Sequence, residues 1–155
     1  MRSRDLTLAL FAALMSTALA LAPALAHLLE LPNKISLPRT DYFTVQQIYR
    51  GWSMLGWLLL VELVSIVAVI VLARGERPLR IAGIVALFGL LAAQALFWTF
   101  TWPANQATAN WTQQPENWEL LRRQWEYSHA GGALLQLATL TALIIGVLGR
   151  PRSMP

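Results

Sequence analysis

Four long apolar runs constrain the fold of this chain more than any other feature of its sequence. They cover residues 6–31, 52–73, 79–102 and 129–148, and Glu62 is the only charged residue in the interior of a run. Each has the roughly 20 residues that an α-helix needs to cross a hydrocarbon core about 30 Å thick. Because a bilayer offers the backbone no hydrogen-bond partners, such runs must be helical. The sequence therefore predicts an all-α fold, an integral membrane four-helix bundle in a single domain over residues 1–155.

The composition supports a membrane environment and excludes several classes of function. Hydrophobic residues make up 56% of the chain and charged residues only 13%, which is far from the balance of a soluble domain. The absence of cysteine excludes disulfides, thiolate metal sites and cysteine nucleophiles. The net charge of +4 could suggest a nucleic-acid partner, but seven of the twelve basic residues lie at the termini and in one short loop. We therefore expect the lipid bilayer as the main partner, and no nucleic acid.

Those basic residues also predict the orientation. The side of the membrane that would hold both termini and the loop near Gly75 carries seven basic and two acidic residues, whereas the other side carries five of each. Loops rich in Lys and Arg stay in the cytoplasm. We predict a multi-pass protein of the plasma membrane with both termini cytoplasmic.

The first run has a second interpretation as a cleaved signal peptide. The charged segment Met1–Asp5 precedes an apolar stretch, and residues 22–26 offer small side chains for cleavage. Cleavage would make His27 the N-terminus, where its amine and ring could bind copper. Apolar residues continue past this site to Leu31, so we expect the run to remain a membrane span.

The connections between the runs are unequal in length. Gly75–Pro78 predicts a tight cytoplasmic turn, which would make the second and third helices antiparallel neighbours. The two outer segments are each about 20 to 25 residues long, and such length indicates a functional cap or flexibility. We expect a partly helical extracytoplasmic cap, with one helix capped by Asp41 and continuous with the second span, and another that begins near Pro115 and continues into the fourth.

The tryptophans concentrate at the predicted outer side. Aromatic belts normally occupy both membrane interfaces, but all seven tryptophans map to the outer half of this chain. They are Trp52, Trp57, Trp98, Trp102, Trp111, Trp118 and Trp125. They either anchor and pack the cap, or form a pocket for an apolar or aromatic ligand.

Two pairs of ionisable residues form the first candidate site. His27 and Glu30 end the first span, Glu126 and His129 begin the fourth, and each pair has the i,i+3 spacing that places both side chains on one helix face. In antiparallel helices the histidines would meet at one depth and the glutamates about 4.5 Å further out. These four candidate catalytic residues suit a general base with an orienting carboxylate.

Two alternatives to catalysis stay open for these residues. All four could bind a single metal ion, whereas a dinuclear site lacks the further glutamates that it needs. Otherwise the histidines are structural and satisfied by Glu or backbone partners, while Arg122 and Arg123 pair with Glu119 or Glu126.

A second candidate site lies deeper in the predicted membrane. Glu62, Gln94 and Gln136 fall at similar depths on three spans, and Ser16 and Thr17 reach the same level on the first. An intramembrane acid normally serves in proton relay or substrate contact. Its structural alternative is a protonated Glu62 that is hydrogen-bonded to Gln94 or Gln136 and joins helices.

A polar segment at residues 99–112 follows the third span. Pro103 should end or kink the helix and free carbonyl groups, which Asn105 or Gln106 could satisfy. Alternatively, these amides would donate to a substrate oxygen. The candidate substrate-binding residues are Glu62, Gln94, Trp102, Asn105, Trp125 and Gln136.

Several of these segments carry a resemblance to a known family. Residues 27–34, 49–52, 100–108 and 117–130 look like those of an uncharacterised bacterial family of four-helix membrane proteins, which is broadly similar to the anthrone oxygenase superfamily. The resemblance implies the bacterial inner membrane. It also implies cofactor-independent oxygenation, in which His27 or His129 deprotonates a polycyclic phenolic substrate.

The sequence thus leaves the function open between two classes of protein. The leading interpretation is a membrane protein of unassigned activity with an outer aromatic and polar pocket for a hydrophobic or aromatic small molecule. The alternatives are the oxygenase that the resemblance implies, and an accessory or structural subunit that binds another membrane protein. No residue pattern identifies a cofactor.

Overall fold

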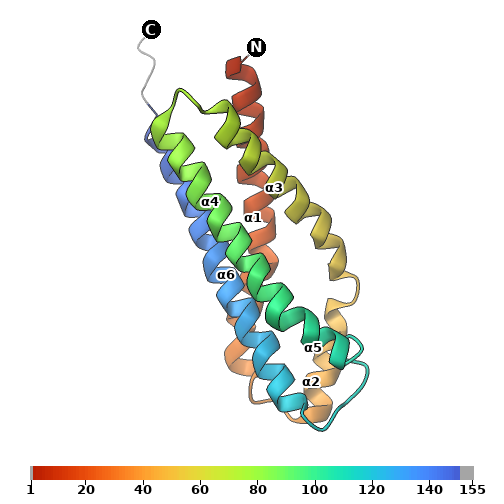
Figure 1. The fold of residues 1–155 in the computed structure, drawn as a ribbon. Helices are drawn as coiled ribbons and strands as arrows, with labels where there is room; N and C mark the ends of the chain where they lie inside the picture. Colours follow the sequence, from red (N-terminus) through yellow and green to blue (C-terminus); the bar gives the residue numbers. More distant parts are fainter. Residues whose placement is uncertain (1, 151–155) are drawn as a thin grey trace.

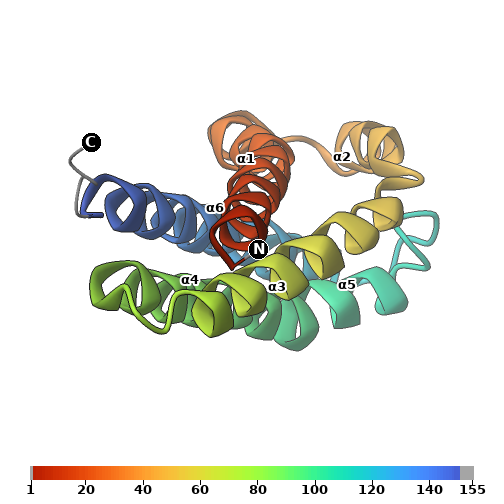
Figure 2. The same ribbon diagram turned by 90° about the horizontal axis from the view of Figure 1, so that it is seen from above.

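The computed structural model describes residues 2–150, and these form a bundle of four long antiparallel helices (Figure 1). The helices are α1 (Arg2–Lys34), α3 (Leu55–Leu72), α4 (Arg77–Leu96) and α6 (Trp118–Leu148). Viewed along the bundle, α1 packs against α3 and α6, and α4 packs against the same two helices (Figure 2). The described residues contain no strand. The predicted all-α class and the four-helix arrangement are confirmed.

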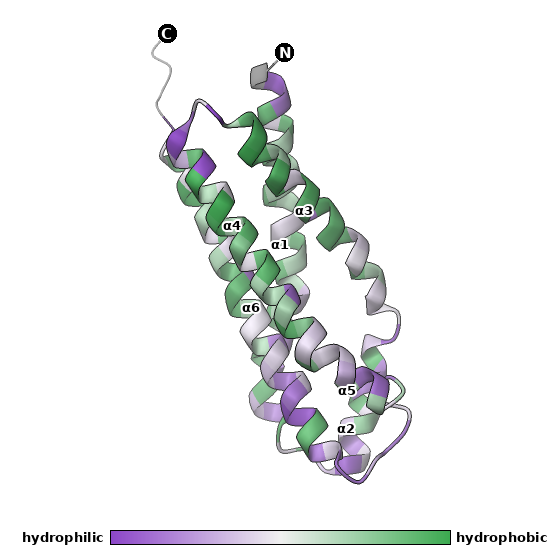
Figure 3. Cartoon of the chain, in the orientation of Figure 1, coloured by the Kyte–Doolittle hydropathy of each residue, from purple (hydrophilic) through white to green (hydrophobic). Residues whose placement is uncertain are grey.

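Short helical elements gather at one end of the bundle, which we call the cap end. They are α2 (Arg39–Gln46), the 3₁₀ turns η1 (Gln47–Tyr49) and η2 (Trp52–Met54), and α5 (Trp102–Ala107). Hydrophilic residues concentrate at this end, whereas the middle of the bundle is mostly apolar (Figure 3). The start of α1 and the end of α6 lie at the opposite end (Figure 1). The predicted partly helical cap is therefore present.

Small residues permit the closest helix contacts in the bundle. A Cβ atom added to Gly146 of α6 would collide with the Cβ of Ala82 on α4, and one added to Gly89 of α4 would collide with the Thr139 hydroxyl of α6. Buried leucines and alanines such as Leu10, Ala13, Leu79, Ala86 and Leu143 fill the interior around these contacts. The interior is packed chiefly by apolar side chains.

The outward faces of the four long helices are also apolar. Large hydrophobic side chains such as Phe11, Trp57, Phe88 and Ile145 are exposed. Each long helical segment is apolar and long enough to cross a membrane, including the continuous segment Arg77–Ala107. Soluble proteins rarely expose apolar patches of such extent.

The predicted helix from Asp41 into the second span is wrong in two respects. The chain breaks at Gly51, whose φ of +89° is left-handed and cannot continue a right-handed helix. Pro38, not Asp41, occupies the cap position of α2, and no side chain makes a capping hydrogen bond there. The fixed φ of proline orients the chain for the helix without such a bond.

The predicted ends of the other helices need similar correction. Pro103 does not end the third span, because a π-helical segment, Phe97–Thr101, leads directly into α5 and places Pro103 in its first turn. A proline in that position loses no essential hydrogen bond. Helix α6 begins at Trp118, three residues after Pro115. Helix α1 continues through Pro32 to Lys34, which brings Lys34 into the candidate site.

Candidate functional site

Two histidines lie in contact at the cap end, one from each of two adjacent helices. The ring centroids of His27 on α1 and His129 on α6 are 4.3 Å apart. Three aromatic rings enclose His27, with centroid distances of 4.6 Å to Tyr49, 5.5 Å to Trp52 and 5.0 Å to Trp125. His27 is buried and His129 is half-buried. The predicted convergence of the two histidines is present, and we call them the histidine pair.

Hydrogen bonding determines which ring nitrogens of the histidine pair can react. Nδ1 of His129 lies 2.8 Å from the carbonyl oxygen of Trp125, which can only accept a hydrogen bond. Nδ1 therefore carries the hydrogen, and in the neutral ring the lone pair lies on Nε2. Nδ1 of His27 is buried and has no hydrogen-bond partner. The pair thus has one nitrogen with a defined lone pair and one buried nitrogen that is not engaged.

A buried lysine organises the ionisable groups beside the histidine pair. Nζ of Lys34 lies 3.0 Å from Oε1 of Glu126 and 3.8 Å from Oε2 of Glu30, and it donates a hydrogen bond of 2.9 Å to the Tyr49 hydroxyl. The ammonium also lies 4.7 Å from the centre of the Trp125 ring, a cation–π distance. The two predicted glutamates therefore do converge, but on Lys34.

Two tyrosines complete this arrangement. Tyr42 donates a 2.9 Å hydrogen bond to Oε1 of Glu126 and accepts one from the Gln46 amide, while Tyr49 donates to Oε2 of Glu30. Burial, together with the neighbouring carboxylates, raises the pKa of both tyrosines. Both remain neutral hydrogen-bond donors. We call Glu30, Lys34, Tyr42, Tyr49 and Glu126 the lysine cluster.

The four residues of the metal alternative do not form one ligand set in the structure. Among residues 2–150 no group of three or more His, Asp or Glu side chains is placed to hold a metal ion. Instead, the ammonium of Lys34 supplies the positive charge between Glu30 and Glu126. His27 and His129 instead contact each other and aromatic rings.

The expected pairing of Arg122 with a glutamate is also wrong. Its guanidinium donates a 2.8 Å hydrogen bond to the carbonyl of Leu37 and lies 4.5 Å from the centre of the Trp118 ring. Glu126 is already engaged by Lys34 and Tyr42. Arg122 therefore fastens the segment after α1 to the start of α6.

The side-chain oxygen of Asn105 makes an internal contact, and donation from its amide to a substrate stays a prediction. The side-chain oxygen of Asn105 accepts hydrogen bonds from the indole nitrogens of Trp125, at 2.9 Å, and Trp111, at 3.1 Å. Asn105 thus fixes Trp125, whose ring lies 3.9 Å from His129. Trp102 packs on Trp98 at a centroid distance of 5.6 Å and is exposed.

The deeper candidate site brings together three of the predicted residues, Glu62, Gln136 and Thr17. Gln136 donates a 2.6 Å hydrogen bond to Oε1 of Glu62, and both side chains are buried. Gln94 is only half-buried on α4, and it is Gln136 that binds Glu62. The Ser16 hydroxyl donates to carbonyls of its own helix.

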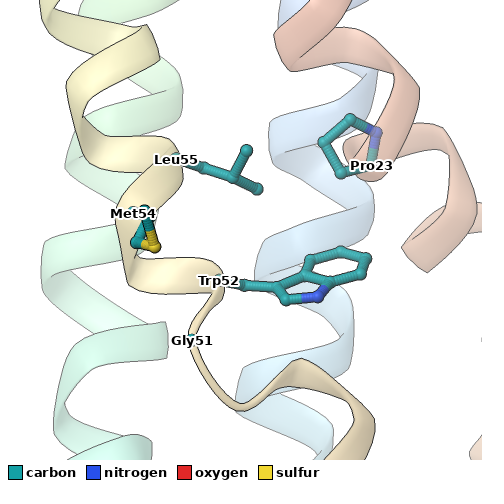
Figure 4. A pocket seen from close by; sticks show the side chains of 5 residues that line it. All are labelled: Pro23, Gly51, Trp52, Met54 and Leu55. Atoms are coloured by element: carbon teal, nitrogen blue, oxygen red, sulfur yellow. The ribbon is translucent and has the colours of Figure 1, made fainter.

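A surface crevice lies beside the histidine pair. It has a volume of about 310 Å³ and is lined by Pro23 of α1 and by Gly51, Trp52, Met54 and Leu55. The Trp52 indole extends from η2 towards α1, beneath Pro23 (Figure 4). Because this indole also contacts His27, a single side chain separates the crevice from the histidine pair.

Four further residues belong to the site but were not predicted to, namely Lys34, Tyr42, Gln46 and Tyr49. One signal was available for Lys34, since His27, Glu30 and Lys34 follow i, i+3, i+7 spacing on one helix face. The other three come from the cap, whose position relative to the bundle no local pattern specifies.

No protein-family model matches this chain, and no curated protein or solved structure shows significant similarity to it.

Proposed function

We propose that this chain is an integral protein of the bacterial inner membrane with an acid–base pocket at its outer end for a hydrophobic aromatic molecule. Four helical segments of sufficient length and an apolar outer surface support the membrane location. The positive-inside rule supports cytoplasmic termini, since basic residues exceed acidic ones at the end that holds them.

The observation that carries the acid–base proposal is the buried histidine pair. A fully buried polar atom normally has a hydrogen-bond partner, and leaving one without costs about 1–3 kcal/mol. Nδ1 of His27 has no partner inside an aromatic cage. We assign proton exchange with a ligand to these two neighbouring imidazoles.

The surroundings favour a ligand that becomes negatively charged. A ligand hydroxyl or acidic C–H would transfer its proton to a ring nitrogen of the pair, and the electron pair would stay on the ligand as an anion. The ammonium of Lys34 donates a hydrogen bond to the Tyr49 hydroxyl, and the Tyr49 ring contacts the His27 ring. Its positive charge stabilises such an anion.

The lining of the pocket favours an aromatic ligand that enters from the membrane. The crevice at Trp52 is an open surface depression with almost no polar lining. Rings of Tyr49, Trp52 and Trp125 surround His27. A flat apolar ligand would replace the Trp52 ring against His27.

The resemblance to the anthrone oxygenase superfamily gives this proposal a specific reaction. Deprotonation of a tricyclic anthrone yields a carbanion that adds dioxygen to form a hydroperoxide. Loss of water then leaves a ketone, so that one oxygen atom stays in the anthraquinone and the other leaves as water. Dioxygen is the oxidant, and the histidine pair acts only as the base.

The first experiment measures this reaction with the purified protein in detergent. Anthrone in air-saturated buffer should be converted to anthraquinone with matching dioxygen uptake, and His27→Ala and His129→Ala should each lower the rate by about 10²-fold or more, the typical contribution of a general base. Tyr127→Phe is the matched control, because Tyr127 lies on the same helix but is exposed.

Size-exclusion chromatography and thermal unfolding would establish that each variant is folded. Turnover that persists in both histidine variants would remove the histidine pair as the base. If instead the substitutions lower stability and release a copurifying membrane protein while no ligand is converted, the accessory-subunit alternative is correct.

A further inference from the structure

Glu62 has an environment that a charged carboxylate does not tolerate. Its side chain is fully buried on α3 in the middle of the bundle. One oxygen, Oε1, accepts the hydrogen bond from Gln136 of α6. The other, Oε2, is buried and has no hydrogen-bond partner.

Thr17 of α1 supplies the third side of this environment. It is fully buried and its hydroxyl interacts with the Glu62 carboxyl, yet Oγ1 of Thr17 also lacks a hydrogen-bond partner of normal geometry. Oε2 of Glu62 and Oγ1 of Thr17, on different helices, therefore both lack a hydrogen bond of normal geometry. The threonine hydroxyl can donate its own hydrogen or accept one, so it can pair with the Glu62 carboxyl in either protonation state.

No positive charge is available to balance an ionised Glu62. Residues 6–26 of α1, 81–107 of α4 and α5, and 130–148 of α6 contain no Lys, Arg, His, Asp or Glu, and Glu62 is the only such residue in 51–73. The groups that contact its carboxyl are the amide of Gln136 and the hydroxyl of Thr17. Burial of an unpaired charge costs several kcal/mol, and the group normally becomes neutral instead.

We propose that Glu62 is an intramembrane proton-binding site, occupied at neutral pH, at which the bound proton joins three helices. The protonated Oε2 donates a hydrogen bond to Oγ1 of Thr17 on α1, and Oε1 accepts from Gln136 on α6. This arrangement removes both unsatisfied atoms with one hydrogen. The proton on Glu62 does not involve the histidine pair, so this proposal and the proposed function can each fail independently.

Infrared spectroscopy of the full-length protein in detergent tests the proposal directly. At neutral pH the spectrum should contain the C=O stretching band of a protonated carboxylic acid, and the band should shift in D₂O. Glu62→Gln should abolish the band and leave the protein folded, since glutamine retains an acceptor oxygen and a donor group. Glu126→Gln is the control at the other fully buried carboxyl, which is paired with Lys34, and the band should persist in it.

Thr17→Val provides a second variant for the predicted contact. Valine keeps the shape of threonine but cannot accept a hydrogen bond, so the band should remain and move to higher frequency. The proposal is overturned if the wild-type spectrum lacks the band, or if the band survives in Glu62→Gln. An unchanged frequency in Thr17→Val would refute the donation to Thr17.

Discussion

Lys34 holds together groups from three separate parts of the chain. It lies in the last turn of α1, contacts Glu126 of α6, and donates a hydrogen bond to Tyr49 of η1. Because the side chains of Lys34 and Glu126 are 5% and 0% exposed, water cannot replace these contacts. A buried pair of this kind is costly to break, because the remaining charge stays desolvated.

Lys34→Met should therefore destabilise the protein by about 3–5 kcal/mol, measured by chemical denaturation in detergent. The double variant Lys34→Met, Glu126→Gln should recover a large part of this loss, since no unpaired charge remains. A single variant as stable as the wild type would show that Glu126 is not an ionised partner of Lys34. Additive effects of the two substitutions would lead to the same conclusion.

At the scale of residues, the sequence predicted which ionisable residues lie together but not the cation that the two glutamates contact. The i,i+3 pairs His27–Glu30 and Glu126–His129 do lie together. The sequence left a metal ion open as one alternative at the glutamates, whereas the cation between them is Lys34, which lies beyond the predicted end of the first span at Leu31. The first helix continues three residues beyond Leu31, through Pro32, and Lys34 therefore lies in the cluster.

At the scale of elements, the long helices could be predicted from the sequence, whereas the local breaks between and within them could not. Four runs of apolar residues predicted the four long helices. The break at Gly51 and the π-helical segment Phe97–Thr101 are set by a single backbone conformation and by a hydrogen-bond shift. Neither leaves a pattern in the hydrophobic periodicity, so both were missed.

Close packing of α4 on α6 gives a prediction at the scale of elements. Gly146→Ala would place its Cβ against the Cβ of Ala82, which cannot rotate away, and should cost about 1–3 kcal/mol of stability. Gly132→Ala on the same helix meets no heavy atom within 4 Å and should be neutral or stabilising by up to about 1 kcal/mol. Thermal unfolding of both variants would compare them, and equal stability would contradict the close contact.

At the scale of the whole molecule, the long helices bury a few polar side chains and expose many apolar ones. Glu62, Gln136 and Thr17 face the interior, whereas large apolar side chains such as Phe11 and Phe88 face outward. Outside the long apolar segments, polar groups concentrate at the cap end (Figure 3). This distribution suits a lipid solvent on the sides of the bundle and water at its ends.

The central claim of this account is that the bundle crosses a membrane with its cap end outside the cytoplasm. The chain contains no cysteine, so single cysteines can report orientation without background. Ser36 is exposed at the cap end, and Gly75 is exposed in the loop between α3 and α4. A membrane-impermeant maleimide should label Ser36→Cys in cells with a permeable outer envelope and an intact inner membrane, and should label Gly75→Cys only after lysis. Labelling of both variants in intact cells, or of Gly75→Cys alone, would contradict the claim.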